Sequence, residues 1–307
     1  MCLYEFAKSP GHRLEYHVAP GVRNKVAVVT DSVAALPRKL VNEYDIHIIP
    51  VRITVGGKVY RDTDEDLPPE LVHEFQSIPK LDTTPWPPEF YSQVYKELSQ
   101  KASNIVHVVC FSQFTSTISL ARVGAEMAQE AIPHLKVEVV DSATVTMAQG
   151  FIALAAARAA AAGKDVDEVI EAASLVKSKV NLVFALDSLS YLARTGRINK
   201  LAAWSGSFLN VKPIVGLSHG KAHPLALVRS KSQSIRRLIK VMHDSANSAQ
   251  PLHAAVMEVE RPQEAEALSN MITEQFRPAE LYQTQFTPVM QVVAGSGLLG
   301  VAFYCGD

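Results

Sequence analysis

Residues 25–32 read KVAVVTDS, and residues 105–112 read IVHVVCFS. Each stretch is a continuous β-branched, apolar run that ends in polar residues, which predicts a strand covered on both faces. Residues 137–140 predict a further strand of this kind. Helical segments follow the later strands, at residues 118–131 and 146–162. An alternation of buried strands and helices is typical of a parallel sheet with helices on both faces.

The pattern changes after Gly163. A hairpin around His219 and Gly220, followed by alternating helices and strands, predicts an α+β second domain. We therefore expect an α/β protein of two domains. The predicted divisions are an N-terminal extension (1–24), a parallel-sheet α/β domain (25–164) and an α+β domain (165–307). Finer expectations are a helix at 200–209 and closing strands at 281–293 and 298–304.

Composition excludes several classes of protein. The formal net charge is −1 and no basic stripe is present, so a nucleic-acid partner is not expected. The three cysteines show neither metal-ligand spacing nor a disulfide framework, which predicts a cytoplasmic protein. Residues 1–24 do not resemble a signal peptide. The most apolar stretch, residues 146–162, is interrupted by Gln149 and Arg158, so we expect a buried helix and no membrane span.

Hydroxyl side chains gather where a ligand would bind. Ligands of open parallel sheets lie at the carboxyl ends of the strands. Residues 112–117, which follow the strand at 105–110, contain Ser112, Thr115, Ser116 and Thr117 immediately before a helix. Hydroxyls and the free N–H groups of a helix start suit a carboxylate or a phosphate. The alternative is ordinary helix capping, for which one such residue is enough.

Two further segments offer polar groups to the same anion. Thr83 and Thr84 lie in a proline-rich loop, where they add hydroxyls or belong to a plain connection. Arg197, in the stretch YLARTGRI at residues 191–198, offers a bidentate partner for an anion. Taken alone, this segment also fits a surface loop with solvated arginines.

An enzyme is the main alternative to a binding protein. Asp31, Asp141 and Asp187 each precede a serine at the end of an apolar run, which suggests a metal or nucleophile site or, more simply, a capped turn. No matching histidine is present to activate a serine, and no known phosphate-loop or hydrolase motif occurs. His107 lies in the middle of a strand, where a satisfied core histidine is the default. A phosphotransferase or hydrolase using Asp31 or Asp141 remains the alternative hypothesis.

The order of these segments resembles the DegV family of fatty-acid-binding proteins from Lys25 to Tyr304. The matching stretches are TDSVAALP (30–37), TTPWPP (83–88), the hydroxyl-rich stretch at 112–118, VEVVDS (137–142), LSYLARTGRI (189–198) and VAGSG (293–297). The chain departs from the family pattern at Val293, where the family has a histidine. It also lacks the family's glycine at Ser116.

The resemblance implies a long-chain fatty acid, such as palmitate, stearate or oleate, clamped between the two domains. Its carboxylate would be held by Thr84 and Thr115. The nearby polar groups would be Thr83, Ser112, Ser116 and Arg197. The resemblance also implies a carrier without enzymatic activity or cofactor, which passes the acid to a separate fatty acid kinase. A lipid-sensing regulatory module is the other possibility.

The apolar helix at residues 146–162 is a candidate wall for the acyl chain. Met147, Phe151 and Leu154 are its candidate tail contacts, and ordinary core packing is the alternative for each. Each buried CH₂ group contributes roughly 0.8 kcal/mol, so a sixteen-carbon chain contributes on the order of 10 kcal/mol before the costs of binding.

Overall fold

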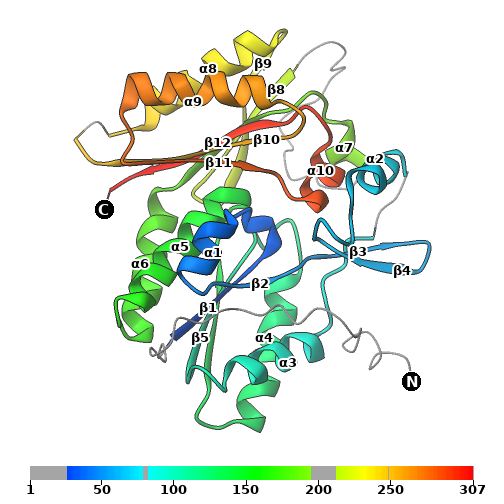
Figure 1. Ribbon diagram of the computed structural model, residues 1–307, viewed down its shortest axis with the longest axis vertical. Coiled ribbons are helices and arrows are strands. Elements are labelled where there is room, and N and C mark those ends of the chain that lie inside the picture. The colour runs from blue at the N-terminus through cyan, green and yellow to red at the C-terminus, as the bar shows by residue number, and fades with distance from the viewer. Residues whose placement is uncertain (1–25, 79–81, 195–211, 248, 307) are drawn as a thin grey trace.

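The computed structural model describes residues 26–78, 82–194, 212–247 and 249–306. Two sheets organise the described chain, and they are stacked with helices between them (Figure 1). This arrangement confirms the predicted α/β class, with a parallel sheet in the first part of the chain and a mixed sheet in the second.

The first sheet has the strand order β2-β1-β5-β6, and all of its strands are parallel. The strands are β1 (Val26–Asp31), β2 (His47–Ile49), β5 (Asn104–Val109) and β6 (Lys136–Asp141). The chain leaves β1 for β2 on one side and later returns to β5 on the other side, so the strand order reverses between β1 and β5. Crevices for ligands form at such a reversal.

Helices cover both faces of this sheet. One face packs against α3 (Pro88–Leu98) and α4 (Thr117–Ala131), whose apolar side chains join those of Val29 and Ile105. The other face packs against α5 (Thr146–Ala161), with α1 (Arg38–Glu43) and α6 (Val166–Lys179) beside it (Figure 1). A short 3-10 turn, η2 (Ser32–Ala34), connects β1 toward α1.

Helix α5 lies between the two sheets and is buried on nearly every side. This explains the absence of a polar face in its sequence, because a helix that is covered on all sides has no face exposed to solvent. Gly150 permits its close approach to η2, since a Cβ at this position would lie 2.7 Å from the carbonyl oxygen of Ala34.

The second sheet has the order β11-β10-β12-β7-β8-β9, in which only the β10–β11 pair is parallel. Its strands are β7 (Asn181–Ala185), β8 (Lys212–Ser218), β9 (Lys221–Val228), β10 (Leu252–Glu258), β11 (Glu280–Gln285) and β12 (Leu299–Cys305). Helices α8 (Lys231–Ser245) and α9 (Pro262–Phe276) cover its outer face. Its inner face packs toward α5.

Shorter elements border the space between the sheets. They are the hairpin of β3 (Arg52–Val55) and β4 (Lys58–Arg61), and the helices α2 (Pro69–Ser77), α7 (Ser190–Arg194) and α10 (Pro288–Ala294). Figure 1 shows α2, α7 and α10 together beside the second sheet.

One element differs from the prediction. Residues 281–293 were expected to form one strand, but β11 ends at Gln285 and a helix, α10, begins at Pro288. Proline suits the first turn of a helix and interrupts a strand ladder. In addition, the carboxylate of Asp62 accepts a hydrogen bond from Val289 N at the start of this helix. The helix expected at residues 200–209 lies outside the described residues.

The predicted division of the chain at residues 163–165 falls in the turn between α5 and α6, which pack against each other. The first strand of the second sheet starts later, at Asn181. The division between domains therefore stays a prediction, while the change from one sheet to the other comes after α6.

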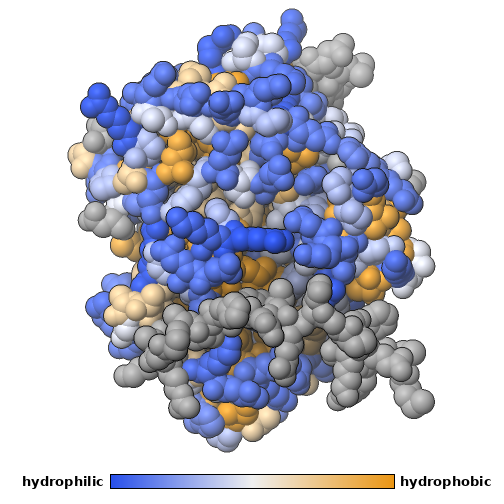
Figure 2. Space-filling model, viewed as in Figure 1, coloured by the Kyte–Doolittle hydropathy of each residue, from blue (hydrophilic) through white to orange (hydrophobic). Residues whose placement is uncertain are grey.

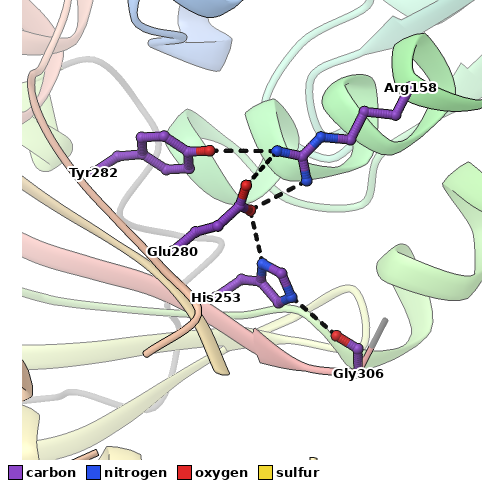
Figure 3. Close-up of polar contacts among 5 residues, drawn as sticks. All are labelled: Arg158, His253, Glu280, Tyr282 and Gly306. Atoms are coloured by element: carbon purple, nitrogen blue, oxygen red, sulfur yellow. Dashed lines mark hydrogen bonds and ion pairs between the residues drawn. The ribbon is translucent and has the colours of Figure 1, made fainter. Parts of the chain in front are cut away.

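A polar cluster joins the two halves near the end of α5. We call it the clasp, and its members are Arg158, His253, Glu280, Tyr282 and Gly306 (Figure 3). The guanidinium of Arg158 donates to both carboxylate oxygens of Glu280, at 3.1 Å for Nη1 to Oε2 and at shorter range from Nη2. The ring of His253 bridges Glu280 and the carbonyl oxygen of Gly306, with contacts of 2.7 and 3.0 Å. The clasp thus links α5 to β10 and β11.

Among the described residues, the exposed large hydrophobic side chains are Val123, Leu175 and Leu227. Figure 2 shows a largely hydrophilic face with scattered hydrophobic residues. None of the helices among the described residues is long and apolar enough to span a membrane.

Candidate functional site

A cavity lies at the carboxyl ends of β1 and β5, where the order of the parallel strands reverses. It includes about 1180 Å³ of space, part of which is open to solvent. Asp31 and Cys110, which end these two strands, both line it. The sequence therefore predicts the location of this cavity correctly, because ligands of open parallel sheets bind at this edge.

The cavity has two unlike walls. Most of its polar side chains come from the first part of the chain: Asp31, Arg52, Thr83, Tyr91, His107, Cys110, Thr115, Thr117 and Thr146. The second part contributes apolar side chains, which are Phe184, Leu192, Leu217, Ala222, Phe286, Val289, Met290, Val293, Ala294 and Leu298. Among the described residues, the first part of the chain therefore contributes all the polar lining side chains, together with apolar ones such as Ile49, Trp86 and Phe114, and the second part contributes only hydrocarbon.

Asp31 is fixed by backbone donors at the edge of the sheet. Its carboxylate accepts from Val33 N at 3.1 Å and from Cys110 N at 2.9 Å, so it ties the end of β1 to the end of β5. Burial raises the pKa of Asp31 to about 6, although these hydrogen bonds act in the opposite direction. Asp31 therefore has a structural task, and its neighbour Ser32 continues the same network.

Helix α10 is held over the cavity by a second buried carboxylate. Asp62 accepts from Val289 N at 2.8 Å and from the hydroxyl of Ser32 at 2.6 Å. Burial raises the pKa of Asp62 to about 6. Because Val289 lies in the first turn of α10, the carboxylate satisfies a free N–H of the helix start. Asp62 thus explains why a helix forms where a strand was expected.

The hydroxyl-rich stretch before α4 divides between the cavity and the surface. Thr115 and Thr117 line the cavity, and their hydroxyl oxygens are 2.9 Å apart. Thr115 Oγ1 also accepts from Thr117 N at 3.2 Å, which caps the helix start. Ser112 and Ser116 are exposed and do not line the cavity.

Only one threonine of the proline-rich loop reaches the cavity. Thr83 lines it, whereas Thr84 does not. Thr84 N donates to Asp82 Oδ1 at 2.8 Å, and its carbonyl accepts from Arg52 Nε at 3.1 Å. Trp86 anchors the loop by donating from Nε1 to the carbonyl of Pro50 at 2.7 Å.

The predicted tail contacts lie in the core beside the cavity. Met147, Phe151 and Leu154 are buried within α5, but none of them is among the lining residues. The lining part of this segment is Val145 and Thr146, at the start of the helix. The apolar lining from the second part of the chain comes mainly from α10 and the second sheet.

Thr146 combines two unusual features. Its φ of 56° lies in the left-handed region, which is strained for a β-branched residue. Its hydroxyl is buried and has no hydrogen-bond partner among the described residues. Strained residues with unpaired polar groups cluster at ligand sites.

Arg197 lies outside the described residues, so its position relative to the cavity stays a prediction. The nearest described element is α7, from which Leu192 lines the cavity.

His107 and Tyr91 line the cavity although the sequence reasoning did not select them. Tyr91 projects from α3, and the rings of Tyr91 and His107 are 6.1 Å apart. The available signal was a histidine within an otherwise apolar strand, IVHVVC, because a polar side chain in a buried strand is unusual and indicates a specific role. Its partner residues on α3 were not apparent from spacing.

The remaining aspartates of the Asp-Ser pairs act in turns and ion pairs. Asp141 accepts from Ala143 N at 2.8 Å and Ser112 N at 3.3 Å, as in an Asx-turn. Asp187 pairs with Lys212 and Arg261. The described residues contain no group of three or more His, Cys, Asp or Glu side chains suited to hold a metal ion.

Comparison with known proteins identifies the relatives of this fold. The model of the DegV family, described as "Uncharacterised protein, DegV family", matches residues 25–305. The chain belongs to the DegV family. It is 34% identical to a DegV domain-containing protein of Streptomyces coelicolor, over 90% of this chain and 97% of the relative. It is 28% identical to protein DegV of Bacillus subtilis, over 91% of this chain and 98% of the relative.

Solved structures of DegV proteins share the fold. A structure described as "Crystal Structure of DegV, a fatty acid binding protein from Bacillus subtilis" superposes with a TM-score of 0.79 at 26% identity, over 92% of this chain and 99% of that chain. A DegV family protein from Thermus thermophilus gives a TM-score of 0.82 at 22% identity, over 92% of this chain and 99% of that chain. The second likeness concerns the fold alone.

Proposed function

We propose that this DegV protein binds one long-chain fatty acid in the cavity between its two sheets and presents it to a fatty acid kinase. Palmitate, stearate and oleate are the ligands with the expected chemistry. The carboxylate would lie against the edge of the first sheet, and the acyl chain would extend along α10 and the inner face of the second sheet.

The observation that carries this proposal is the division of the cavity into a polar wall and an apolar wall. Burial of hydrocarbon against Phe286, Met290 and Leu298 stabilises a bound chain by about 0.8 kcal/mol for each CH₂ group. The polar wall then has one task, which is to prevent the loss of hydrogen bonds when the carboxylate leaves water. A ligand with a small anionic head and a long apolar tail meets both requirements.

Thr83 and Thr115 are the first candidates for the head group, because both line the cavity at its polar wall. Hydroxyl donors to a carboxylate form short charge-assisted hydrogen bonds. Thr84, Ser112, Ser116 and Arg197 complete the proposed set of head-group residues, and in this geometry Thr84, Ser112 and Ser116 lie outside the cavity lining. They would join the site only if the loop or the helix start moved on binding.

The relative from Bacillus subtilis, described as a fatty acid binding protein, supports the ligand class. Presentation to a kinase follows from the family resemblance. It predicts that a partner kinase forms an acyl-phosphate only when the loaded protein is present. Acyl-phosphate formation from free acid at the same rate without this protein would contradict that part of the proposal.

Extraction of the purified protein with organic solvent tests the ligand directly. Mass spectrometry of the extract should identify a fatty acid in about equal molar amount to the protein. A Val293→Trp variant, which fills the cavity from α10, should yield little acid. The matched control is Val123→Trp, because Val123 is 44% exposed on α4. A clean wild-type protein that also fails to bind added palmitate would contradict the proposal.

A further inference from the structure

His107 has one satisfied ring nitrogen and one unsatisfied ring nitrogen. It projects from β5 toward α3, and the residue is completely buried. Its Nδ1 lies 2.7 Å from the hydroxyl of Tyr95. Its Nε2 is buried and has no hydrogen-bond partner among the described residues. Because the ring lines the cavity, the polar wall contains a ring nitrogen, Nε2, whose hydrogen-bonding capacity is unused among the described residues.

The Tyr95 contact determines which nitrogen carries the proton. Burial raises the pKa of Tyr95 far above its ordinary value, so its hydroxyl keeps its proton. Nδ1 of His107 is the one acceptor that this hydroxyl contacts among the described residues. A phenol that donates to Nδ1 requires the tautomer in which the hydrogen resides on Nε2. The free nitrogen of His107 is therefore an N–H donor.

The imidazole is neutral in the apo protein. Burial lowers the pKa of His107 to about 3, and the charge of His47 adds to this effect. A neutral donor can face an apolar cavity without the large cost of a buried charge. When a carboxylate enters, a hydrogen bond from Nε2 becomes charge-assisted and correspondingly strong.

We infer that His107 positions the fatty acid head group by donating a hydrogen bond from Nε2–H to its carboxylate, and that Tyr95 fixes the tautomer required for this bond. This inference rests on the proposed function. His107 thereby distinguishes a carboxylate from other head groups of similar size, because the deprotonated acid offers acceptors only. The residue acts beside Thr83 and Thr115, on the same polar wall.

Two substitutions at His107 separate the contribution of the N–H donor from the contribution of side-chain packing. His107→Met removes the N–H and keeps an apolar side chain of similar length. His107→Gln keeps an N–H near the position of Nε2. Affinities for palmitate and for 1-hexadecanol are measured by calorimetry with delipidated protein. His107→Met should weaken palmitate binding about 10-fold to 100-fold, and it should reduce the preference for acid over alcohol about 10-fold. His107→Gln should restore most of the palmitate affinity.

The outcomes distinguish this inference from the proposed function. Equal losses for acid and alcohol, or no loss in His107→Met, would overturn the inference alone. The second result would mean that Nε2 meets only a water molecule. A wild-type protein that binds neither ligand would overturn the proposed function, and the inference with it.

NMR spectroscopy gives a readout that does not depend on a variant. In protein labelled with ¹⁵N-histidine, His107 should show the Nε2–H tautomer before binding. Its Nε2–H signal should shift downfield when palmitate is added. A Tyr95→Phe variant should weaken this tautomer preference and reduce palmitate affinity by a smaller factor than His107→Met. An Nδ1–H tautomer, or a signal that palmitate does not move, would overturn the inference.

Discussion

Two polar clusters lie near opposite ends of helix α5, a half-buried one and a buried one, and they differ in how many of their polar groups have hydrogen-bond partners. The clasp lies near Arg158, where the carboxylate of Glu280 meets guanidinium and imidazole donors. The polar wall of the cavity lies near the start of the helix. There, Nε2 of His107 and the hydroxyl of Thr146 have no partners among the described residues.

This difference supports a structural role for the clasp and the proposed ligand-binding role for the polar wall. The groups of the clasp pair with one another across the two halves, and the hydrogen bonds from Arg158 and His253 lower the pKa of Glu280 to about 2 although its partial burial acts in the opposite direction. Unpaired buried polar groups destabilise a fold unless something else binds them. Changes in the clasp should therefore alter stability, and changes in the polar wall should alter binding.

Removal of the clasp carboxylate should have the largest effect. Glu280→Ala leaves Arg158 and His253 without their shared acceptor, and it should lower the free energy of unfolding by about 2–4 kcal/mol. Urea denaturation of wild-type and variant protein measures this. The folded variant should still bind palmitate within about threefold of wild type, since the clasp does not line the cavity. A stable variant with lost binding would reverse the proposed roles.

The buried carboxylate that holds α10 and the paired carboxylate of the clasp should also respond to pH in opposite directions. Asp62 has a pKa of about 6 when folded, above its ordinary value of 3.8, so folding takes up a proton between these values. Relative to Asp62→Asn, wild-type protein should gain about 2 kcal/mol of stability as the pH falls from 7 to 4. The pKa of Glu280 is lowered on folding, so the stability that this residue contributes changes with pH in the opposite direction. Its contribution is complete above 4.5 and is lost as the pH falls toward 2.

Denaturation curves at several pH values, with Asp62→Asn and Glu280→Gln as the two reference variants, measure these slopes. If both comparisons had the same sign, the contrast between a buried carboxylate near the cavity and a paired one in the clasp would fail.

Removal of a cavity hydroxyl should affect binding more than folding. Thr115→Val keeps the shape of the side chain and removes a proposed donor to the carboxylate. It should weaken palmitate binding about 10-fold, while the loss of its capping contact with Thr117 lowers stability by about 1 kcal/mol. Thr273→Val is the matched control, because Thr273 is exposed on α9 and does not line the cavity. Equal effects of the two substitutions on palmitate affinity would count against Thr115.

The smallest expected effect concerns the strained residue at the start of α5. Thr146→Gly relieves the left-handed backbone and deletes an unpaired hydroxyl, so stability should stay constant or rise by up to about 1 kcal/mol. The same substitution at Thr117, whose hydroxyl is paired, should destabilise the protein. A clear loss of stability in Thr146→Gly would show that the hydroxyl has a structural partner.

The fold was predictable to the extent that it depends on local pattern. The β-branched runs that form β1 and β5 identify buried parallel strands, and their order places the cavity at the ends of these strands. For α10 the sequence offers one local signal, Pro288, which suits a helix start, but the mostly apolar residues after it fit either a strand or a helix. The deciding contact is with Asp62, which lies 227 residues earlier in the chain.

The site was predictable only in part, because side-chain direction and contacts between distant residues decide which residues line the cavity. A cluster of hydroxyls at a helix start singles out Thr115, but the direction of each side chain in the turn decides which of its neighbours reach the cavity. The importance of His107 depends on the face of β5 that it occupies and on Tyr95 from another helix. Neither relation follows from sequence spacing.

A crystal structure of the protein with palmitate is the most direct test of the contrast between the two clusters. The carboxylate oxygens should lie about 3 Å from the hydroxyls of Thr83 or Thr115 and from Nε2 of His107, with the acyl chain against α10. The contacts of the clasp should be unchanged. A carboxylate at the α10 end with the chain reversed, or a cavity closed by protein side chains, would contradict the assignment of the unpaired groups to a ligand.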